Sequence, residues 1–256
     1  MGKSSLNYGE LRDWFTSTNE ACCPKGTFPI DKHQTFILDF EIYVNELLPI
    51  YSYFRVSFST QYLLSLPFKS EHLMADATYQ IVWEGYKVFL TGTSDRRRHF
   101  HPFTVSICTQ HDYAFIFKVL ESSIFAINSK RYRPKQVIGD GAGAITNGCL
   151  VGFENCIYDR LMCWSHVIRN CDKNMKIKNK EFANNIKCDL HTLQLSYDKI
   201  CFDFLYKLFR QKWTAKKDQD VDFFLVYFDK TWVTSNINLR RSLPWDPVYN
   251  QWARIG

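Results

Sequence analysis

The sequence predicts an α/β protein built on a mixed sheet. Three segments with β-like patterns, residues 73–83, 86–91 and 100–109, follow one another with short polar breaks, which is typical of an antiparallel meander. Residues 112–128 then carry apolar side chains along one face of a helix. A strand, a helix and a second strand follow between residues 136 and 164, and this alternation favours an α/β arrangement with flanking helices.

Ahead of the meander the pattern is weaker. Residues 18–29 are polar, contain two prolines and a glycine, and predict a loop. The mixed apolar stretch at residues 35–53 predicts a helix, whereas residues 54–58 alternate like a strand. Residues 61–66 predict a short helix that Pro67 closes.

The elements after the meander have clearer limits. Asp112 stands where the start of a helix favours an acid, and the apolar stripe that follows is Tyr113, Ile116, Phe117, Leu120, Ile124 and Ile127. Residues 136–138 predict a short buried strand, residues 142–153 a helix and residues 160–164 another strand.

Beyond residue 170 helical spacing takes over. Apolar residues recur in steps of three and four, at Phe182, Ile186, Leu190, Leu193, Tyr197, Ile200, Phe204 and Leu208. We therefore expect a helical insertion over about residues 171–230, broken into two or three helices.

The composition is that of a folded domain. Hydrophobic residues make up 46% of the 256 residues and charged residues 23%, which excludes a disordered, collagen-like or low-complexity chain. The net charge of +6 divides into −2 for residues 1–75, +3 for residues 76–170 and +5 for the remainder. Basic residues beside aromatic ones, as at Lys212 and Trp213, suit a phosphate-bearing partner, and a solvated charged face is the alternative.

Cysteine content and the N-terminus bear on the compartment. Nine cysteines are an odd number, and no apolar signal segment precedes Glu10. A myristoylation motif would need Ser or Thr where the chain has Leu6, and no run approaches about 18 apolar residues. We expect an intracellular protein of the nucleus or cytoplasm with free thiols and no membrane span.

Two carboxylates are candidates for metal binding. Asp76 falls inside a predicted buried strand, where an ionised group needs a partner or a metal, and Asp140 ends a second apolar strand. If these strands are neighbours, the pair suits Mg²⁺ or Mn²⁺. In the alternative interpretation Asp140 forms a turn between glycines and Asp76 bonds to the backbone.

The glycines around Asp140 also match a loose dinucleotide fingerprint. Gly139, Gly141 and Ala144 have the required spacing, and Asp159 lies 20 residues after the first glycine. However, Asp159 precedes its strand instead of ending it, and the unit follows a meander instead of opening the fold. We therefore expect no small-molecule cofactor.

Cys163 and His166 have the spacing of two ligands of one zinc ion. The nearby cysteines do not form a second tight pair, so a buried thiol beside a satisfied histidine is the favoured interpretation over zinc. A cysteine nucleophile with a histidine base lacks an orienting third group.

Taken together, six blocks in this order make residues 54–256 resemble the Mutator-like element (MULE) transposase domain. They are Phe58-Ser-Thr60 with Leu63-Leu64; Asp76-Ala-Thr-Tyr79; Gly92-Thr-Ser-Asp95 with His99-Phe-His-Pro-Phe103; Ile138-Gly-Asp140-Gly-Ala-Gly-Ala-Ile145; Cys163-Trp-Ser-His166-Val-Ile-Arg169-Asn170; and residues 186–213.

The resemblance implies an RNase H-like core at residues 54–256, with the helical insertion after its fifth strand and an N-terminal segment, partly loop and helix, at residues 1–53. It also implies that Asp76 is the first catalytic acid and Asp140 the second. Cys163 and His166 match the Cys-x-x-His motif of the family.

By the same resemblance the chemistry is metal-dependent cleavage and joining of DNA strands, with Mg²⁺ or Mn²⁺ as cofactor and transposon ends and target DNA as partners. A homo-oligomer is compatible with this function. The family uses a late Glu as its third acid, and no Glu follows Glu181. We therefore expect a core that is truncated before this acid, with little or no activity. The alternative is a domesticated or decayed derivative that binds DNA or a protein without catalysis.

Overall fold

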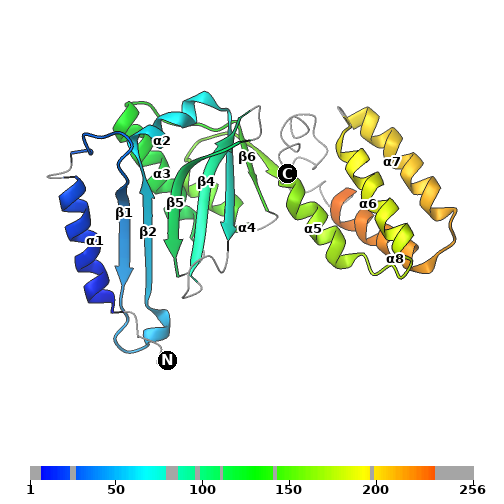
Figure 1. Cartoon of the computed structure of the whole chain (residues 1–256), viewed down its shortest axis with the longest axis horizontal. Helices are drawn as coiled ribbons and strands as arrows, with labels where there is room; N and C mark the ends of the chain where they lie inside the picture. Colours follow the sequence, from blue (N-terminus) through cyan, green and yellow to red (C-terminus); the bar gives the residue numbers. More distant parts are fainter. Residues whose placement is uncertain are drawn as a thin grey trace. The chain divides into compact units, whose positions relative to one another are not determined.

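The computed structural model describes residues 7–23, 27–78, 86–95, 99–109, 112–140, 143–196 and 199–233. The chain divides into two compact units (Figure 1). Unit 1 comprises Met1–Asp95, Phe100–Lys135 and Ala142–Tyr158, and unit 2 comprises Arg96–His99, Gln136–Gly141 and Asp159–Gly256. The described residues form seven strands and eight α-helices, so the predicted α/β class is confirmed.

Unit 1 contains an antiparallel sheet. Its strands are β1 (Phe36–Tyr43), β2 (Tyr53–Ser59), β5 (Phe100–Cys108), β4 (Lys87–Ser94) and β3 (His72–Thr78), in that spatial order. Each strand is antiparallel to its neighbour. The predicted meander is therefore confirmed as β3, β4 and β5, and β1 and β2 extend the same sheet.

The predicted helix at residues 35–53 is wrong, because this stretch contains β1. From Asp39 onward charged and apolar residues alternate, with Asp39 and Glu41 on one face and Phe40 and Ile42 on the other. A period of two fits a strand and not a helix. β1 pairs with β2 from Phe36 to Tyr43, so the sheet crosses the boundary that the sequence placed at residues 53 and 54.

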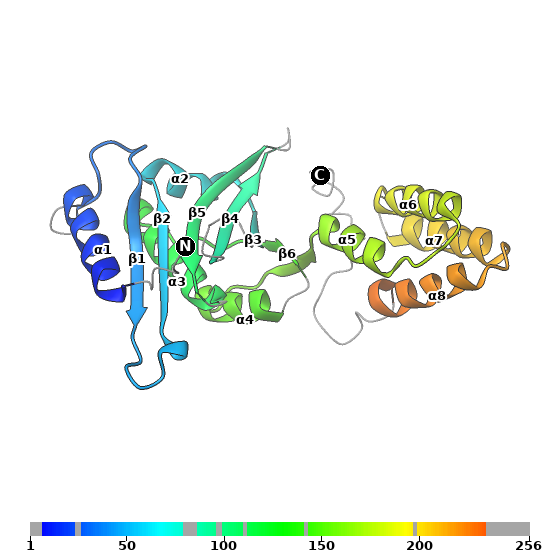
Figure 2. The ribbon, with the colours of Figure 1, turned by 60° about the horizontal axis from the view of Figure 1, so that its bottom comes forward.

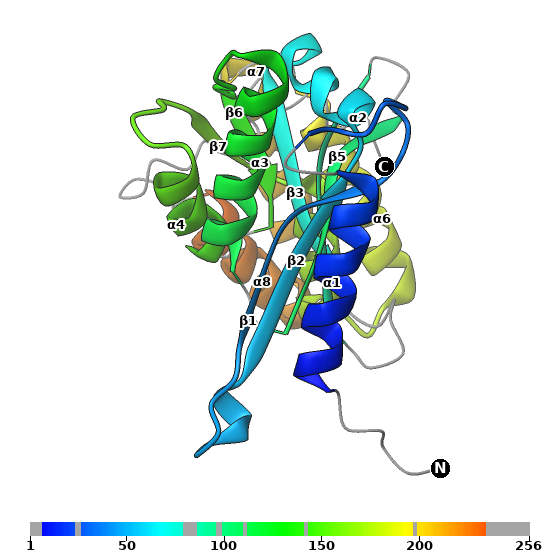
Figure 3. The ribbon, with the colours of Figure 1, turned by 90° about the vertical axis from the view of Figure 1, so that its left-hand side faces the viewer.

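The first helix, α1 (Tyr8–Cys22), corrects the loop expected from residue 18 onward. Asn7 caps α1, because its side-chain oxygen accepts hydrogen bonds from the backbone N–H groups of Gly9 and Glu10 at 3.0 and 3.2 Å. Phe15 is 2% exposed and packs with Ile37 and Val56, so α1 covers one face of β1 and β2 (Figure 3).

Three further helices belong to unit 1. They are α2 (Gln61–Ser65), which the 3₁₀ turn η3 (Leu66–Lys69) continues, α3 (Tyr113–Asn128) and α4 (Gly143–Gly152). All three were predicted from the sequence, and η3 contains the Pro67 that was expected to end α2.

Helices α3 and α4 approach each other through glycine. A Cβ atom at Gly148 would clash with the backbone and Cβ of Tyr113, and one at Gly152 would clash with Phe117 in the same way. Helices packed at this distance have room for hydrogen only, so glycine at these two positions sets the separation of α3 and α4.

Unit 2 contains two parallel strands, β6 (Gln136–Gly139) and β7 (Asp159–Met162). The strand predicted at residues 160–164 is confirmed over residues 160–162, while Trp164 already begins α5 (Trp164–Asn174). The predicted helical insertion contains α6 (Lys180–Gln194), α7 (Lys199–Thr214) and α8 (Gln219–Phe228), followed by the π-helical turn η4 (Asp229–Val233) (Figures 1 and 2).

The apolar stripe predicted for the insertion is only half correct. In α6 the side chains of Ile186, Leu190 and Leu193 are buried and Phe182 is partly buried. In α7 the side chains of the stripe are exposed instead, to 81% for Ile200, 61% for Phe204 and 45% for Leu208. Tyr197 falls outside the described residues. α7 instead buries Phe209 and Trp213. The break between the helices changes the helical phase, so one continuous spacing cannot describe both. None of the described helices combines the length and apolar character needed to cross a membrane.

Candidate functional site

Asp76 lies on β3, as predicted, but its side chain is exposed, so the expectation of a buried carboxylate is wrong. Its neighbours Leu73 and Ala75 are 0% and 2% exposed, and alternation along the strand turns Asp76 to the opposite face. The Asp76 carboxylate accepts a hydrogen bond from the backbone N–H of Ala77 at 2.9 Å.

Asp140 directly follows β6 and is half-buried. Its backbone carbonyl accepts a hydrogen bond from the guanidinium of Arg160, which is 6% exposed on β7. The same guanidinium donates to the carbonyls of Val137, at 3.2 Å, and of Leu161. Arg160 thus ties the end of β6 to β7 and fixes the backbone from which Asp140 projects.

The two carboxylates belong to different units, Asp76 to unit 1 and Asp140 to unit 2. Each presents the oxygen donors that Mg²⁺ and Mn²⁺ take, so the type of donor fits these metals. Within the part of the chain that the structure describes, histidine, cysteine and acidic side chains do not gather in a group of three or more.

Cys163 and His166 lie together at the start of α5, where Cys163 is the N-cap residue. Burial raises the pKa of Cys163, but the hydrogen bond and charge of His166 and the backbone N–H groups of His166 and Ser165 outweigh it, so the pKa is lowered overall. By contrast, burial raises the pKa of Cys108 and Cys171 to about 12. Cys163 is therefore a thiol with enhanced thiolate character.

The dinucleotide fingerprint is only partly described by the structure. Gly139 ends β6 and Ala144 lies in the first turn of α4, whereas Gly141 falls outside the described residues. The turn that would hold a pyrophosphate is therefore not part of the structural description.

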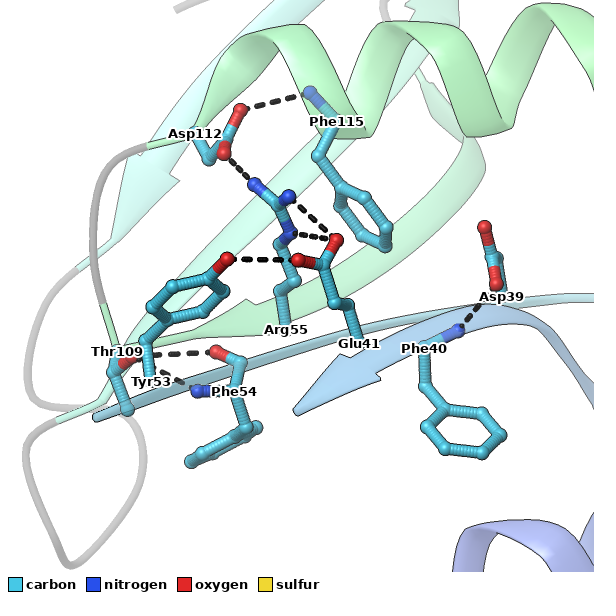
Figure 4. Close-up of polar contacts among 9 residues, drawn as sticks. All are labelled: Asp39, Phe40, Glu41, Tyr53, Phe54, Arg55, Thr109, Asp112 and Phe115. Carbon is cyan, nitrogen blue, oxygen red and sulfur yellow. Dashed lines mark hydrogen bonds and ion pairs between the residues drawn. The ribbon is translucent and has the colours of Figure 1, made fainter. Parts of the chain in front are cut away.

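A network around Arg55 was not foreseen from the sequence (Figure 4). Arg55 on β2 bonds to the Glu41 carboxylate of β1 at 2.6 Å and forms an ion pair with Asp112 at the start of α3. Tyr53 donates a hydrogen bond to Glu41 at 2.7 Å, and the Arg55 guanidinium lies 4.7 Å from the ring centre of Phe115. Hydrogen bonds from Arg55 and Tyr53 lower the pKa of Glu41.

This network lines one end of a groove of about 550 Å³ between β1 and α3. At the other end Glu121 accepts hydrogen bonds from Arg131 and Arg133 at 2.9 and 3.2 Å. Burial raises the pKa of Asp39, which also lines the groove. Charged side chains that line the groove form ion pairs with one another. Among them, the pair of Arg55 with Asp112 links the sheet to the start of α3.

The periodicity of the sequence could not predict this groove. The charged residues that line it come from two strands, a helix and a loop that are far apart in sequence. The one local signal was Asp112, which the sequence identified as the start of α3 without indicating its second partner, Arg55.

No protein-family model matches this chain, and a search of curated proteins gives no significant match. The likeness to MULE transposases therefore stays a prediction from the sequence blocks.

Proposed function

We propose that this chain is a DNA-binding core of the MULE transposase type, with an RNase H-like fold and metal-dependent phosphoryl-transfer chemistry. The order of elements along the chain supports this proposal. The meander of β3, β4 and β5 is followed by α3, β6, α4 and β7, and then, among the described residues, by the helices α5, α6, α7 and α8. This is the order that the resemblance implies, including the position of the helical insertion.

The observation that carries the proposal is the place of the two acids within these elements. Asp76 lies on the first strand of the meander, and Asp140 directly follows β6, the first strand of the parallel pair. Those are the positions at which the resemblance puts the first and second catalytic acids.

Each residue would have a distinct task. Asp76 would offer an exposed carboxylate to a divalent cation, and Asp140 a second one from a backbone that Arg160 fixes. A bound Mg²⁺ or Mn²⁺ ion would supply Lewis-acid activation of the attacking hydroxyl and stabilisation of the leaving oxygen. Because the family uses three acids and this pair supplies two, we expect slow strand cleavage.

The charge distribution supports DNA as the partner. The basic excess lies after residue 75, and Lys216 and Lys217 are exposed in the turn that follows α7. When exposed cations contact DNA phosphates, counterions are released from the DNA. The affinity for DNA should therefore fall as the salt concentration rises. A protein with this function would work in the nucleus.

The test uses the purified 256-residue chain with labelled duplex DNA and Mn²⁺ or Mg²⁺. Metal affinity is measured by calorimetry and strand cleavage by gel electrophoresis, for the wild type and for Asp76→Asn and Asp140→Asn. The matched control is Asp13→Asn, which removes an exposed carboxylate of α1. We expect both site variants to lose metal binding and cleavage while the control retains them.

A result in which both site variants bind metal as the wild type does would overturn the assignment of Asp76 and Asp140. Salt-sensitive DNA binding without cleavage, unchanged in both variants, would favour the alternative of a non-catalytic derivative that binds DNA. If the wild type binds neither DNA nor metal, the proposal as a whole is overturned.

A further inference from the structure

The connection between β1 and β2 carries a concentrated apolar surface. This hairpin extends beyond the other strands of unit 1 (Figures 1 and 3). Leu47 and Ile50 are 91% and 84% exposed, and four more large side chains beside them are about half exposed. We call this set the apolar tip; it consists of Tyr43, Val44, Leu47, Leu48, Ile50 and Tyr51.

The apolar tip is held in shape by hydrogen bonds. The side-chain oxygen of Asn45 accepts from the backbone N–H groups of Leu47 and Leu48 at 3.1 and 2.8 Å. The Asn45 N–H itself donates to the Ser52 hydroxyl at 2.9 Å, which closes the base of the loop. Because the turn is already fixed, docking it against a partner costs little further conformational entropy.

The size of the apolar tip fits a protein interface. At roughly 150–200 Å² for each fully exposed large side chain, the exposed fractions leave about 650 Å² uncovered. That exceeds the few hundred Å² at which an apolar patch ordinarily marks an interaction site. Two such surfaces together would bury about 1300 Å², which lies within the range of stable interfaces.

The charges around the apolar tip identify its occupant. Glu46 is the one charged residue of the loop at residues 43–52, and an anionic membrane would call for cations there instead. Arg12 of α1 lies at the loop end of the same hairpin, where its guanidinium donates to the Ile42 carbonyl at 3.4 Å. The chain therefore carries a counter-charge for Glu46 next to the same apolar surface.

We propose that the apolar tip docks onto the apolar tip of a second copy of this chain, forming a two-fold dimer. A two-fold contact places like against like, which suits a nearly uncharged apolar surface. It also allows Glu46 of one copy to meet Arg12 of the other, so the charges complement each other across the interface.

The first test measures molar mass by sedimentation and light scattering between 1 and 100 µM on the full chain. We expect a wild-type dimer and at least about tenfold weaker association for the double variant Leu47→Asn/Ile50→Asn. Ile157→Asn is the matched control, because Ile157 is 95% exposed in unit 1 and lies outside the tip. Circular dichroism verifies that every variant folds.

The second test reverses the charges. Glu46→Arg and Arg12→Glu should each weaken the dimer, and combining both in one chain should restore it, since the pair is then exchanged across the two-fold axis. A rescue of this kind cannot come from loss of folding.

Three results would overturn the proposal. They are a wild-type monomer up to 100 µM, a dimer that the tip variants leave intact, and a dimer that dissociates with Phe204→Asn of α7 instead. Binding of a monomeric chain to phosphatidylserine vesicles through the tip would likewise replace the second copy with a membrane.

Discussion

Asp112 joins the sheet of unit 1 to the helix that covers it, because it caps α3 and pairs with Arg55 of β2 at the same time. One carboxylate oxygen accepts from the backbone N–H of Phe115 at 2.8 Å, and the other contacts the Arg55 guanidinium. A single carboxylate thus fixes both where α3 begins and how it is anchored to β2.

The two roles of Asp112 can be separated by substitution. Asp112→Asn keeps a capping oxygen and loses the ion pair, so we expect a loss of about 1 kcal/mol in the free energy of unfolding. Asp112→Ala loses both, and we expect about 2 kcal/mol. Urea denaturation measures the difference, with Asp13→Ala, which removes an exposed carboxylate of α1, as the control. Equal losses for Asn and Ala would mean that the cap contributes nothing.

The close approach of α3 and α4 predicts that only one of two glycine substitutions in α4 destabilises the protein. Gly148→Ala should destabilise unit 1 by about 1–3 kcal/mol, because the added methyl meets the backbone of Tyr113. Gly143→Ala in the same helix has no atom within 4 Å of the added methyl and should be neutral or stabilising by up to about 1 kcal/mol. Thermal denaturation compares the two; equal effects would contradict the glycine contact.

The lowered pKa of Cys163 predicts selective reactivity. At pH 7–8 iodoacetamide should label Cys163 faster than Cys108 and Cys171, whose pKa values of about 12 keep them as thiols. His166→Ala leaves burial as the main influence, so the pKa of Cys163 should rise and labelling slow by roughly tenfold per pKa unit.

Mass spectrometry of the labelled peptides across pH 6–10 measures both effects. Exposed Cys188 supplies an internal reference for reagent concentration within the same digest. A labelling profile that His166→Ala leaves unchanged would contradict the role of the imidazole.

Substitution of Arg160 should destabilise the protein, because its guanidinium bonds to backbone carbonyls at the end of β6. Arg160→Met keeps much of the side-chain volume but leaves the carbonyls of Val137 and Asp140 without their buried donor, at a cost of about 2–3 kcal/mol in the free energy of unfolding. Arg169→Met, an exposed arginine on α5, is the control and should change stability by less than about 0.5 kcal/mol. Comparable losses would show that the buried contacts are not decisive.

Local patterns anticipated most elements after residue 54. The β-like patterns predicted the meander, and the apolar stripe from Tyr113 to Ile127 predicted α3. Both signals are local: the first spans a few consecutive residues and the second a few turns of helix. The mixed apolar stretch at residues 35–53 predicted a helix, although it contains the charged positions Asp39 and Glu41. Their alternation with Phe40 and Ile42 was the stronger signal, and it indicated β1.

The candidate site was predictable only in part. The spacing of Cys163 and His166 correctly predicted that their side chains lie close together, because residues three apart at the start of a helix are neighbours. The exposure of Asp76 depended on which face of β3 is covered, and the partner of Asp112 depended on β2; both are set by tertiary packing that no short window contains.

Each unit is built from separate segments of the chain, which limits how recombination can exchange one unit for another. Residues 142–158, with α4, belong to unit 1 although the chain has already passed through β6 of unit 2. A single genetic crossover placed before β6 would therefore deprive unit 1 of α4, and α3 would expose the surface that Gly148 and Gly152 now cover. Exchange of one unit as an intact cassette needs several breakpoints, so recombination will tend to pass both units on together.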